Sequence, residues 1–418
     1  MKKLLFIPLT LILILSCSGT AIFYTLENEE EIRDTNNFKP DTPVNKILIY
    51  KDAAGTETYI THGKQLWYST AGTQQNPWAA VSIPDGFSTH VVVSSIATFG
   101  TRLYATLIDD DRDSKSALMY MDSVSGVLNE VFSYTRRDGP GSDDYFFYDM
   151  SLFYTDDGLY ISRVNRSWNT ESSDSSSIED TELFYFPSGD YPSASGLDAA
   201  HQISLPGMTL PFLIKDIVST GAGGDTYLIL NEAGSSADSY AAGKLFKATN
   251  SPSSFSEISM DDAYSYNRLY YSEKYSALFI STRTKSDVHP ILYSLSGGPW
   301  LSLPGKSDVQ FSGFADISDV QDKTILVGTR GDVQDGSSSY YNGDGYYEID
   351  MTDPSSIAIQ GNTFALDTNY KSTDLTNSTI MDILYDKVRN KIYTSTSSNG
   401  LWMNKYSESD DARIWYIE

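Results

Sequence analysis

The apolar residues of this chain gather in short segments separated by polar loops, and from Val44 onward one unit recurs seven times. Its clearest element is a pair of short strands. The first strand of each pair has apolar residues followed by a small or hydroxylated one, at Tyr59–Thr61, Leu103–Thr106, Leu159–Ser162, Tyr227–Leu230, Leu278–Ser281, Ile325–Gly328 and Ile392–Ser395. The second strand opens on an apolar or aromatic pair, at Leu66-Trp67, Leu118-Met119, Leu183-Phe184, Leu245-Phe246, Leu292-Tyr293, Tyr346-Tyr347 and Leu401-Trp402.

Two further apolar segments accompany most pairs and complete a four-stranded unit. One precedes the pair, as at Val91–Thr98, Phe146–Tyr154, Ile214–Ser219 and Ile380–Tyr385. The other follows it, as at Trp78–Ile83, Val127–Tyr134, Trp300–Leu303 and Arg413–Ile417. Four short antiparallel strands repeated around an axis predict an all-β fold, a single β-propeller of seven blades over residues 44–418. The unit averages about 54 residues, near the kelch period of about 50, and six or eight blades remain compatible with it.

Two turns between strands are similar to a known propeller motif. Ser69–Trp78 and Ser294–Trp300 resemble the Asp box, although neither keeps its Asp or its full spacing. The strand pairs are similar to the broad class of propellers that includes Asp-box, NHL-like and sensor-type repeats. The resemblance covers the architecture, names no family and carries over no functional residue. Because the last unit ends on its own fourth strand near Ile417, we expect the ring to close between complete blades.

The N-terminus has the layout of an export signal. Lys2 and Lys3 precede an apolar run from Leu4 to Leu15, too short to span a bilayer, and Ile14-Leu15-Ser16-Cys17 resembles the lipobox of bacterial lipoproteins. Cys17 is the only cysteine. The resemblance implies a signal peptide over residues 1–16, lipidation on Cys17 and a tether over residues 17–43. Ser18 resembles the residue that lets lipoproteins reach the outer membrane, while the leaflet stays open.

Charge restricts the partners. The chain carries a formal net charge of −25, which disfavours nucleic acid and anionic lipid headgroups because both require basic surface. Hydrophobic residues at 40% indicate a globular domain with a core of its own. We therefore expect attachment to a membrane through the lipid alone.

A charged position recurs about ten residues before the first strand of five units. It is occupied by Asp149, Asp216, Arg268, Asp316 and Asp382. Innermost strands line the channel of a propeller, so these side chains are candidates for a channel cation site, or for bonds to backbone amides of the next blade. If the carboxylates lie close together, we expect a raised pKa at one of them unless a cation or Arg268 compensates.

A second candidate is a calcium loop. Asp109, Asp111 and Asp113 match the first three ligand positions of such a loop. Ser114 stands where glycine is required and Tyr120 where the bidentate acid belongs. A solvated acidic loop is the competing interpretation, and calcium is the only cofactor that the sequence suggests.

The third candidate is one face of the ring, which we call the long-loop face: the face with the loops between the paired strands and the blade-to-blade connections. Five of these loops are long, at Ile108–Ser116, Val164–Asp180, Asn231–Gly243, Arg283–His289 and Arg330–Gly345. Trp168, Tyr240, Tyr340 and Tyr341 lie in them and suit partner or glycan contact. Mobile loops without a ligand are an equal alternative.

Catalytic motifs are missing. His62, His90, His201 and His289 lack metal-ligand spacing and are expected at the surface, and neither a Gly-x-Ser-x-Gly elbow nor a phosphate-binding glycine loop is present. The sequence therefore favours a non-enzymatic, lipid-anchored binding or scaffold module whose long-loop face contacts another envelope or extracellular protein. The alternatives are a glycan-binding or glycan-cleaving propeller, or a calcium-stabilised binding module.

Overall fold

A computed structural model describes most of the chain from residue 43 onward. The described residues are 43–72, 77–88, 91–109, 115–124, 127–138, 144–169, 176–233, 242–260, 264–283, 288–307, 309–331, 345–360, 379–397, 400–405 and 415–417. Within them the chain is almost entirely β-structure, with one short 3₁₀ turn, Pro354–Ser356. No helix of this part of the chain is long and apolar enough to cross a membrane.

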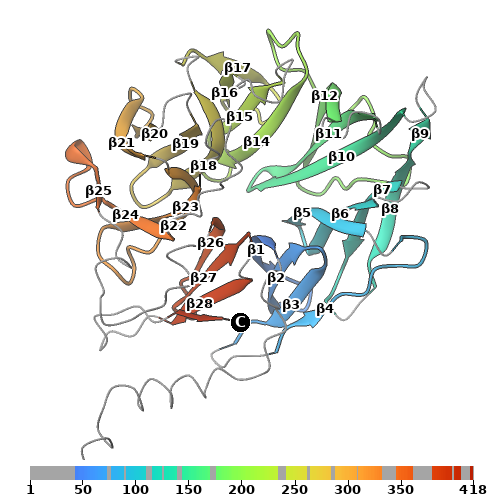
Figure 1. Cartoon of the computed structure of the whole chain (residues 1–418), viewed down its shortest axis with the longest axis horizontal. Helices are drawn as coiled ribbons and strands as arrows, with labels where there is room; N and C mark the ends of the chain where they lie inside the picture. The colour runs from blue at the N-terminus through green and yellow to red at the C-terminus, as the bar shows by residue number, and fades with distance from the viewer. Residues whose placement is uncertain are drawn as a thin grey trace, which may run out of the picture.

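The strands form seven blades of four antiparallel strands. Figure 1 shows the blades arranged around a common centre. Blades 1 and 2 contain β1 Val44–Lys51, β2 Glu57–Gly63, β3 Leu66–Thr70, β4 Ala79–Ala80, β5 Val91–Phe99, β6 Arg102–Asp109, β7 Lys115–Met121 and β8 Asn129–Thr135. Blades 3 and 4 contain β10 Asp144–Thr155, β11 Gly158–Asn169, β12 Ser176–Pro187, β13 Gln202–Ile203, β14 Phe212–Ser219, β15 Thr226–Glu232, β16 Gly243–Ala248 and β17 Phe255–Ile258, with β9 Arg137–Asp138 beside β10. Blades 5 to 7 contain β18 Ser265–Ser272, β19 Ala277–Arg283, β20 Val288–Leu295, β21 Leu301–Ser307, β22 Val309–Asp316, β23 Thr324–Gly331, β24 Tyr346–Asp350, β25 Ala358–Gln360, β26 Ile380–Asp386, β27 Lys391–Thr396, β28 Leu401–Lys405 and β29 Trp415–Ile417. The predicted seven-bladed propeller is confirmed.

The hydrophobic core is divided among the seven boundaries between blades. Seven clusters of buried side chains are present, and each draws its members from two neighbouring blades. Strand β15 shows why the second strand of a blade is apolar at successive positions. Leu228 and Leu230 pack toward blade 3, while Tyr227 and Ile229 pack toward blade 5, because successive side chains of a strand point to opposite faces. A strand buried on both faces therefore needs a continuous apolar run.

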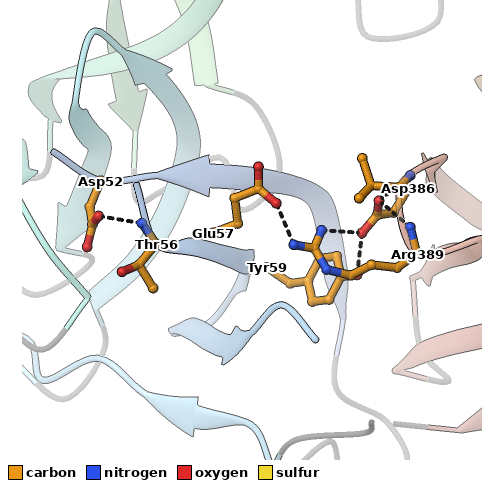
Figure 2. A network of polar contacts seen from close by, with 7 residues as sticks. Asp52, Thr56, Glu57, Tyr59, Asp386 and Arg389 are labelled. Atoms are coloured by element: carbon orange, nitrogen blue, oxygen red, sulfur yellow. Dashed lines mark hydrogen bonds and ion pairs between the residues drawn. The ribbon is translucent and has the colours of Figure 1, made fainter. Parts of the chain in front are cut away.

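The ring closes between the first and last blades without an exchanged strand. β1–β4 and β26–β29 each form a sheet of consecutive strands, as expected from the sequence. Their boundary holds a buried cluster that includes Ile47, Tyr59 and Tyr393. Arg389 also pairs with Asp386 in its own blade, at 2.9 Å, and with Glu57 in blade 1 (Figure 2). The Tyr59 hydroxyl donates to the same Asp386 carboxylate, at 2.5 Å.

Blade 3 is taller than its neighbours. β10, β11 and β12 have 12 residues each, whereas the matching strands of blade 4 have 8, 7 and 6. The β10–β11 turn on the opposite face is tight, since Thr155 pairs with Gly158, so most of the additional length extends toward the long-loop face. The excess is four, five and six residues in the three strands, and at about 3.3 Å per residue an excess of four raises blade 3 by roughly 13 Å. The predicted loop Val164–Asp180 was therefore wrong in its larger part, because β11 and β12 continue pairing as far as Trp168 and Ser176.

Candidate functional site: the central channel and the long-loop face

The innermost strands share a β-bulge at one level of the ring. In six of the seven, the pairing with the second strand of the same blade skips one residue, or two in β22. The skip falls just before Lys46, Ser95, Asp216, Arg268, Phe314 and Asp382. A bulge leaves a residue unpaired and re-aims the neighbouring side chain. The residue after the bulge is polar in five of these strands.

In three of these six strands, the side chain that follows the bulge accepts from a backbone amide of the next blade. Asp216 accepts from the Leu269 amide at 3.1 Å, and Asp382 accepts from the Ile47 amide at 3.3 Å across the closing boundary. The Ser95 hydroxyl accepts from the Leu152 amide at 3.0 Å. These contacts satisfy backbone donors that a bulged sheet edge would otherwise leave unpaired. In blade 6 the level is filled by Gly313, where an added Cβ would lie 2.8 Å from Asp382 Cα.

Charged groups of both signs gather at this level. Arg268 Nη1 lies 4.0 Å from Asp216 Oδ2, and the electrostatic field at Lys46 comes from Asp382, Arg268 and Asp216. Burial raises the pKa of Asp216 and of Asp382, and the positive charges of Arg268 and Lys46 oppose that rise. Burial likewise lowers the pKa of Lys46. The dominant cause at each carboxyl is therefore burial rather than repulsion between carboxylates.

Asp149 and Asp316 do not share the level of Asp216 and Asp382. Asp149 pairs in register with Val164 and its carboxylate contacts Arg166 Nε at 3.3 Å. Asp316 lies at the end of β22, where it accepts from Ser272 Oγ at 2.6 Å and from the Ser318 amide at 3.0 Å. The spacing from the first strand misaligned them because β10 pairs with β11 without a bulge, whereas β22 skips two residues.

The calcium candidate is only partly described. Asp109 ends β6 and is buried, and it accepts from the Ser88 amide at 2.7 Å and from the Ser88 hydroxyl. Asp111 and Asp113 lie outside the described residues. Among those that are described, no group of three His, Cys, Asp or Glu side chains is arranged to hold a metal ion.

The aromatic candidates of the long-loop face are placed in one case. Trp168 belongs to β11, opposite Tyr145 of β10 and Ser176 of β12, near the tip of blade 3. Tyr240, Tyr340 and Tyr341 lie outside the described residues, as does Cys17.

The expected surface position of the histidines was wrong for two of them. His62 and His289 are buried, and His62 Nδ1 lies 2.8 Å from the Val93 carbonyl oxygen of the next blade. Burial lowers the pKa of His62 to about 4, so the ring is neutral at pH 7. His201 is half-buried between Asp190 and Asp198 and stacks on Phe186. His90 lies outside the described residues.

Two lysines of the channel level were missed from the sequence. Lys46 follows the bulge of β1, and Lys215 is the residue that the bulge of β14 leaves out of register. The repeated aspartates suggest a shared carboxylate, whereas the property that the blades share is a polar residue at one level of the innermost strand. That level could have been found by aligning each strand on its apolar partner, Ile47, Ile217 or Ile383.

Fold and site together define a seven-bladed propeller with a polar, mixed-charge channel and one raised blade. No family model matches the chain, and no curated protein is detectably related to it in sequence. Among solved structures it resembles prolyl oligopeptidase B from Galerina marginata, with a TM-score of 0.51, 9% identity and coverage of 90% of this chain and 51% of that one. It also resembles a GH74 enzyme from Niastella koreensis, with a TM-score of 0.51, 11% identity and coverage of 91% and 55%. The chain spans about half the length of either protein, and at these identities the likeness concerns the fold alone.

Proposed function

We propose that this protein is a lipoprotein of the bacterial envelope, held on the outer membrane through Cys17, and that its propeller is a non-enzymatic module that binds another envelope or extracellular protein. The single observation that carries the binding role is the raised tip of blade 3. Its strands extend roughly 13 Å beyond those of blade 4 on the long-loop face, which gives that face a ridge of paired strands rather than loops alone.

The non-enzymatic part of the proposal is supported by the channel carboxylates. Asp216 accepts from the Leu269 and Ile217 amides, so both its oxygens are engaged in joining and shaping blades. Asp382 accepts from Ile47 in the same way. Carboxyl oxygens that already accept backbone amides have a structural role in joining the blades, and this supports a non-enzymatic channel.

The binding role is tested by lowering blade 3 without unfolding it. Replacing residues 168–176 by Asn-Gly would join Ser167 to Ser177, which already pair, through a two-residue hairpin turn. The control is Val388→Ser, a change at a side chain that is 76% exposed in the turn of β26 and β27, on the other face. Each variant is expressed as the full lipoprotein, crosslinked in cells and analysed by mass spectrometry.

We expect the wild type and the control to capture one stoichiometric envelope protein through blade 3, and the shortened variant to lose it while keeping its thermal melt. Equal capture by all three would overturn the assignment to blade 3. Retention on a glycan panel or glycan turnover, in place of protein capture, would favour the glycan-acting alternative. Lipidation is tested separately: Cys17→Ser should abolish incorporation of labelled palmitate and release the protein from membranes, and continued membrane pelleting would contradict the anchor.

A further inference from the structure

The connection between β12 and β13 runs over the face opposite the long-loop face. It comprises residues 188–201, and we call it the strap. β12 ends at Pro187, which pairs with Gly158 of the tight β10–β11 turn, so the strap begins on that face. Leu197 packs against the cluster between blades 2 and 3. The strap therefore crosses from blade 3 to blade 2 before the chain returns to β13.

Tyr191 fixes the strap to blade 2. Its ring centre lies 5.2 Å from the ring centre of Phe99 and 5.0 Å from the guanidinium carbon of Arg102. Its hydroxyl group approaches Gly100 so closely that an added Cβ on this glycine would lie 2.5 Å from the hydroxyl oxygen. Phe99 ends β5 and Arg102 begins β6, so Tyr191 covers the turn between these two strands.

His201 holds the strap at two points. Its Nε2 lies 2.9 Å from Asp190 Oδ2, and its Nδ1 lies 2.7 Å from Asp198 Oδ1. The ring stacks on Phe186 of β12, with 4.3 Å between the ring centres, and 20% of the side chain is exposed. A neutral imidazole has a single N–H, and an ionised carboxylate only accepts hydrogen bonds. Both contacts are therefore hydrogen bonds only while the ring is protonated.

The charges that act on His201 come from the strap itself. The hydrogen bond to Asp190 raises the pKa of His201, burial opposes that rise, and Asp198 adds to it. The hydrogen bond with His201 in turn lowers the pKa of Asp198. Tyr185 of β12 lines the same cavity as Asp190 and His201, and residues 253–255, which blade 4 contributes to this cavity, do not titrate.

Loss of the proton turns one of the two contacts into a repulsion. One ring nitrogen then directs its lone pair at a carboxylate oxygen that lies 2.7 or 2.9 Å away. Asp198 keeps its place, because its carboxylate also accepts from the Ala200 amide at 3.0 Å. The Asp190 carboxylate has no other hydrogen bond or ion pair within the described part of the chain, and it is the residue directly before Tyr191. Withdrawal of Asp190 therefore disturbs the contact of the strap with blade 2.

We propose that the strap is a pH-sensitive latch, which is fastened across blades 2 and 3 while His201 is protonated and is released when His201 loses its proton. The pKa of His201 is higher in the folded protein than its unfolded value of about 6.5. The stabilisation is therefore fully present below about pH 6.5 and is lost as the pH rises through the folded pKa. The latch depends neither on the lipid anchor nor on the protein partner proposed above.

The test is hydrogen exchange of the purified full-length protein between about pH 5.5 and 9, analysed by mass spectrometry. Exchange at the C2 position of histidine gives the pKa of His201, and the protection factors of the strap amides report how firmly the strap is fastened. Asp190→Asn is the test variant, because its amide group can accept from the protonated ring and donate to the neutral one. Asp319→Asn, at an exposed position between β22 and β23, is the control.

In the wild type and in Asp319→Asn we expect a His201 pKa above about 6.5 and a fall in strap protection as the pH passes that pKa. The fall should be about tenfold for each pH unit by which the pKa of His201 exceeds its value in Asp190→Asn. In Asp190→Asn the strap should keep its protection over the whole range. Amides of β15 should be equally protected in all three proteins, which checks that each is folded.

Two results would overturn the latch. Strap protection in the wild type that does not change with pH would show that the strap does not respond to His201. An equal fall in Asp190→Asn would show that the response does not depend on the Asp190 carboxylate.

Discussion

The contact that closes the ring offers a sharp test of how the propeller is stabilised. Arg389 joins Asp386 of blade 7 to Glu57 of blade 1, and Tyr59 donates to the same Asp386 carboxylate (Figure 2). Asp386 is 2% exposed. Burial on its own would raise the pKa of Asp386, but the hydrogen bonds from Tyr59 and Arg389 and the charge of Arg389 outweigh it and hold the pKa below its usual range.

Arg389→Met keeps much of the side-chain volume and removes the charge. Breaking a buried pair by deleting one partner costs about 3–5 kcal/mol, and we take the lower end because the Glu57 side chain is 29% exposed. Unfolding entropy of about 2.1 cal/mol/K per residue over roughly 375 residues amounts to about 0.8 kcal/mol/K. A loss of about 3 kcal/mol therefore lowers the melting temperature by about 4 °C. Tyr59→Phe, which removes one hydroxyl, should cost about 1 kcal/mol.

The pH dependence distinguishes this mechanism from simple loss of packing. A carboxyl whose pKa falls on folding stabilises the folded state above its unfolded pKa of about 3.9, and that contribution is lost as the pH falls through the lowered value. The stability difference between wild type and Arg389→Met should therefore be full at pH 7 and shrink below about pH 4. Asp122→Ala, which breaks the surface pair with Arg102 and leaves the arginine in place, should cost less than about 1 kcal/mol at either pH. Urea unfolding of the four proteins at both pH values measures this, and an Arg389→Met penalty that is absent, or equal at both pH values, would refute the reasoning.

Three further predictions concern the channel level and its surroundings, each measured by urea unfolding. Folding lowers the pKa of His62 to about 4, so the neutral ring stabilises the folded protein fully above its unfolded pKa of about 6.5, and this stability is lost as the pH falls toward 4. Over that range the wild type should lose up to about 3 kcal/mol more stability than His62→Gln. Parallel stability profiles of the two proteins would contradict this. Gly313→Ala places a Cβ 2.8 Å from Asp382 Cα and 2.9 Å from the Ile383 nitrogen, so it should lower the free energy of unfolding by about 1–3 kcal/mol. A neutral effect would mean that β22 and β26 can move apart. Asp216→Ala leaves the Leu269 amide without its acceptor and should lower the free energy of unfolding by about 1–3 kcal/mol. Asp319→Ala, at an exposed position, is the control and should be neutral. Equal effects of the two changes would contradict the role of Asp216 in joining the blades.

The sequence predicted the blades because the second strand of each blade, which is the first strand of each pair, is buried on both faces. A run such as Tyr227–Leu230 has no polar position to interrupt it, and the alternation of its side chains between two clusters makes it recognisable in every blade. The height of blade 3 could not be read in the same way. Residues 164–169 and 176–180 are mostly polar, and they form strands because they pair with one another and with β10. Polar composition favours a loop, and long-range pairing overrides that preference.

The channel was only partly predictable for a related reason. Counting residues back from the first strand of each pair assumes that the innermost strand has the same bulge in every blade. This is true for Asp216, Arg268 and Asp382 but not for Asp149 or Asp316. One inserted or missing residue in the pairing moves a side chain to the other face of its strand. The residue spacing within a single repeat does not show whether its innermost strand has a bulge.

The ring constrains its channel residues less tightly than its core. In three of the boundaries the next blade presents an amide that Ser95, Asp216 or Asp382 satisfies, and in blade 6 the backbone itself approaches Gly313. What the fold requires at this level is therefore an acceptor or a close approach, and several residue types meet that need. Charge at and above the level is then free to vary from blade to blade without disturbing the clusters between blades.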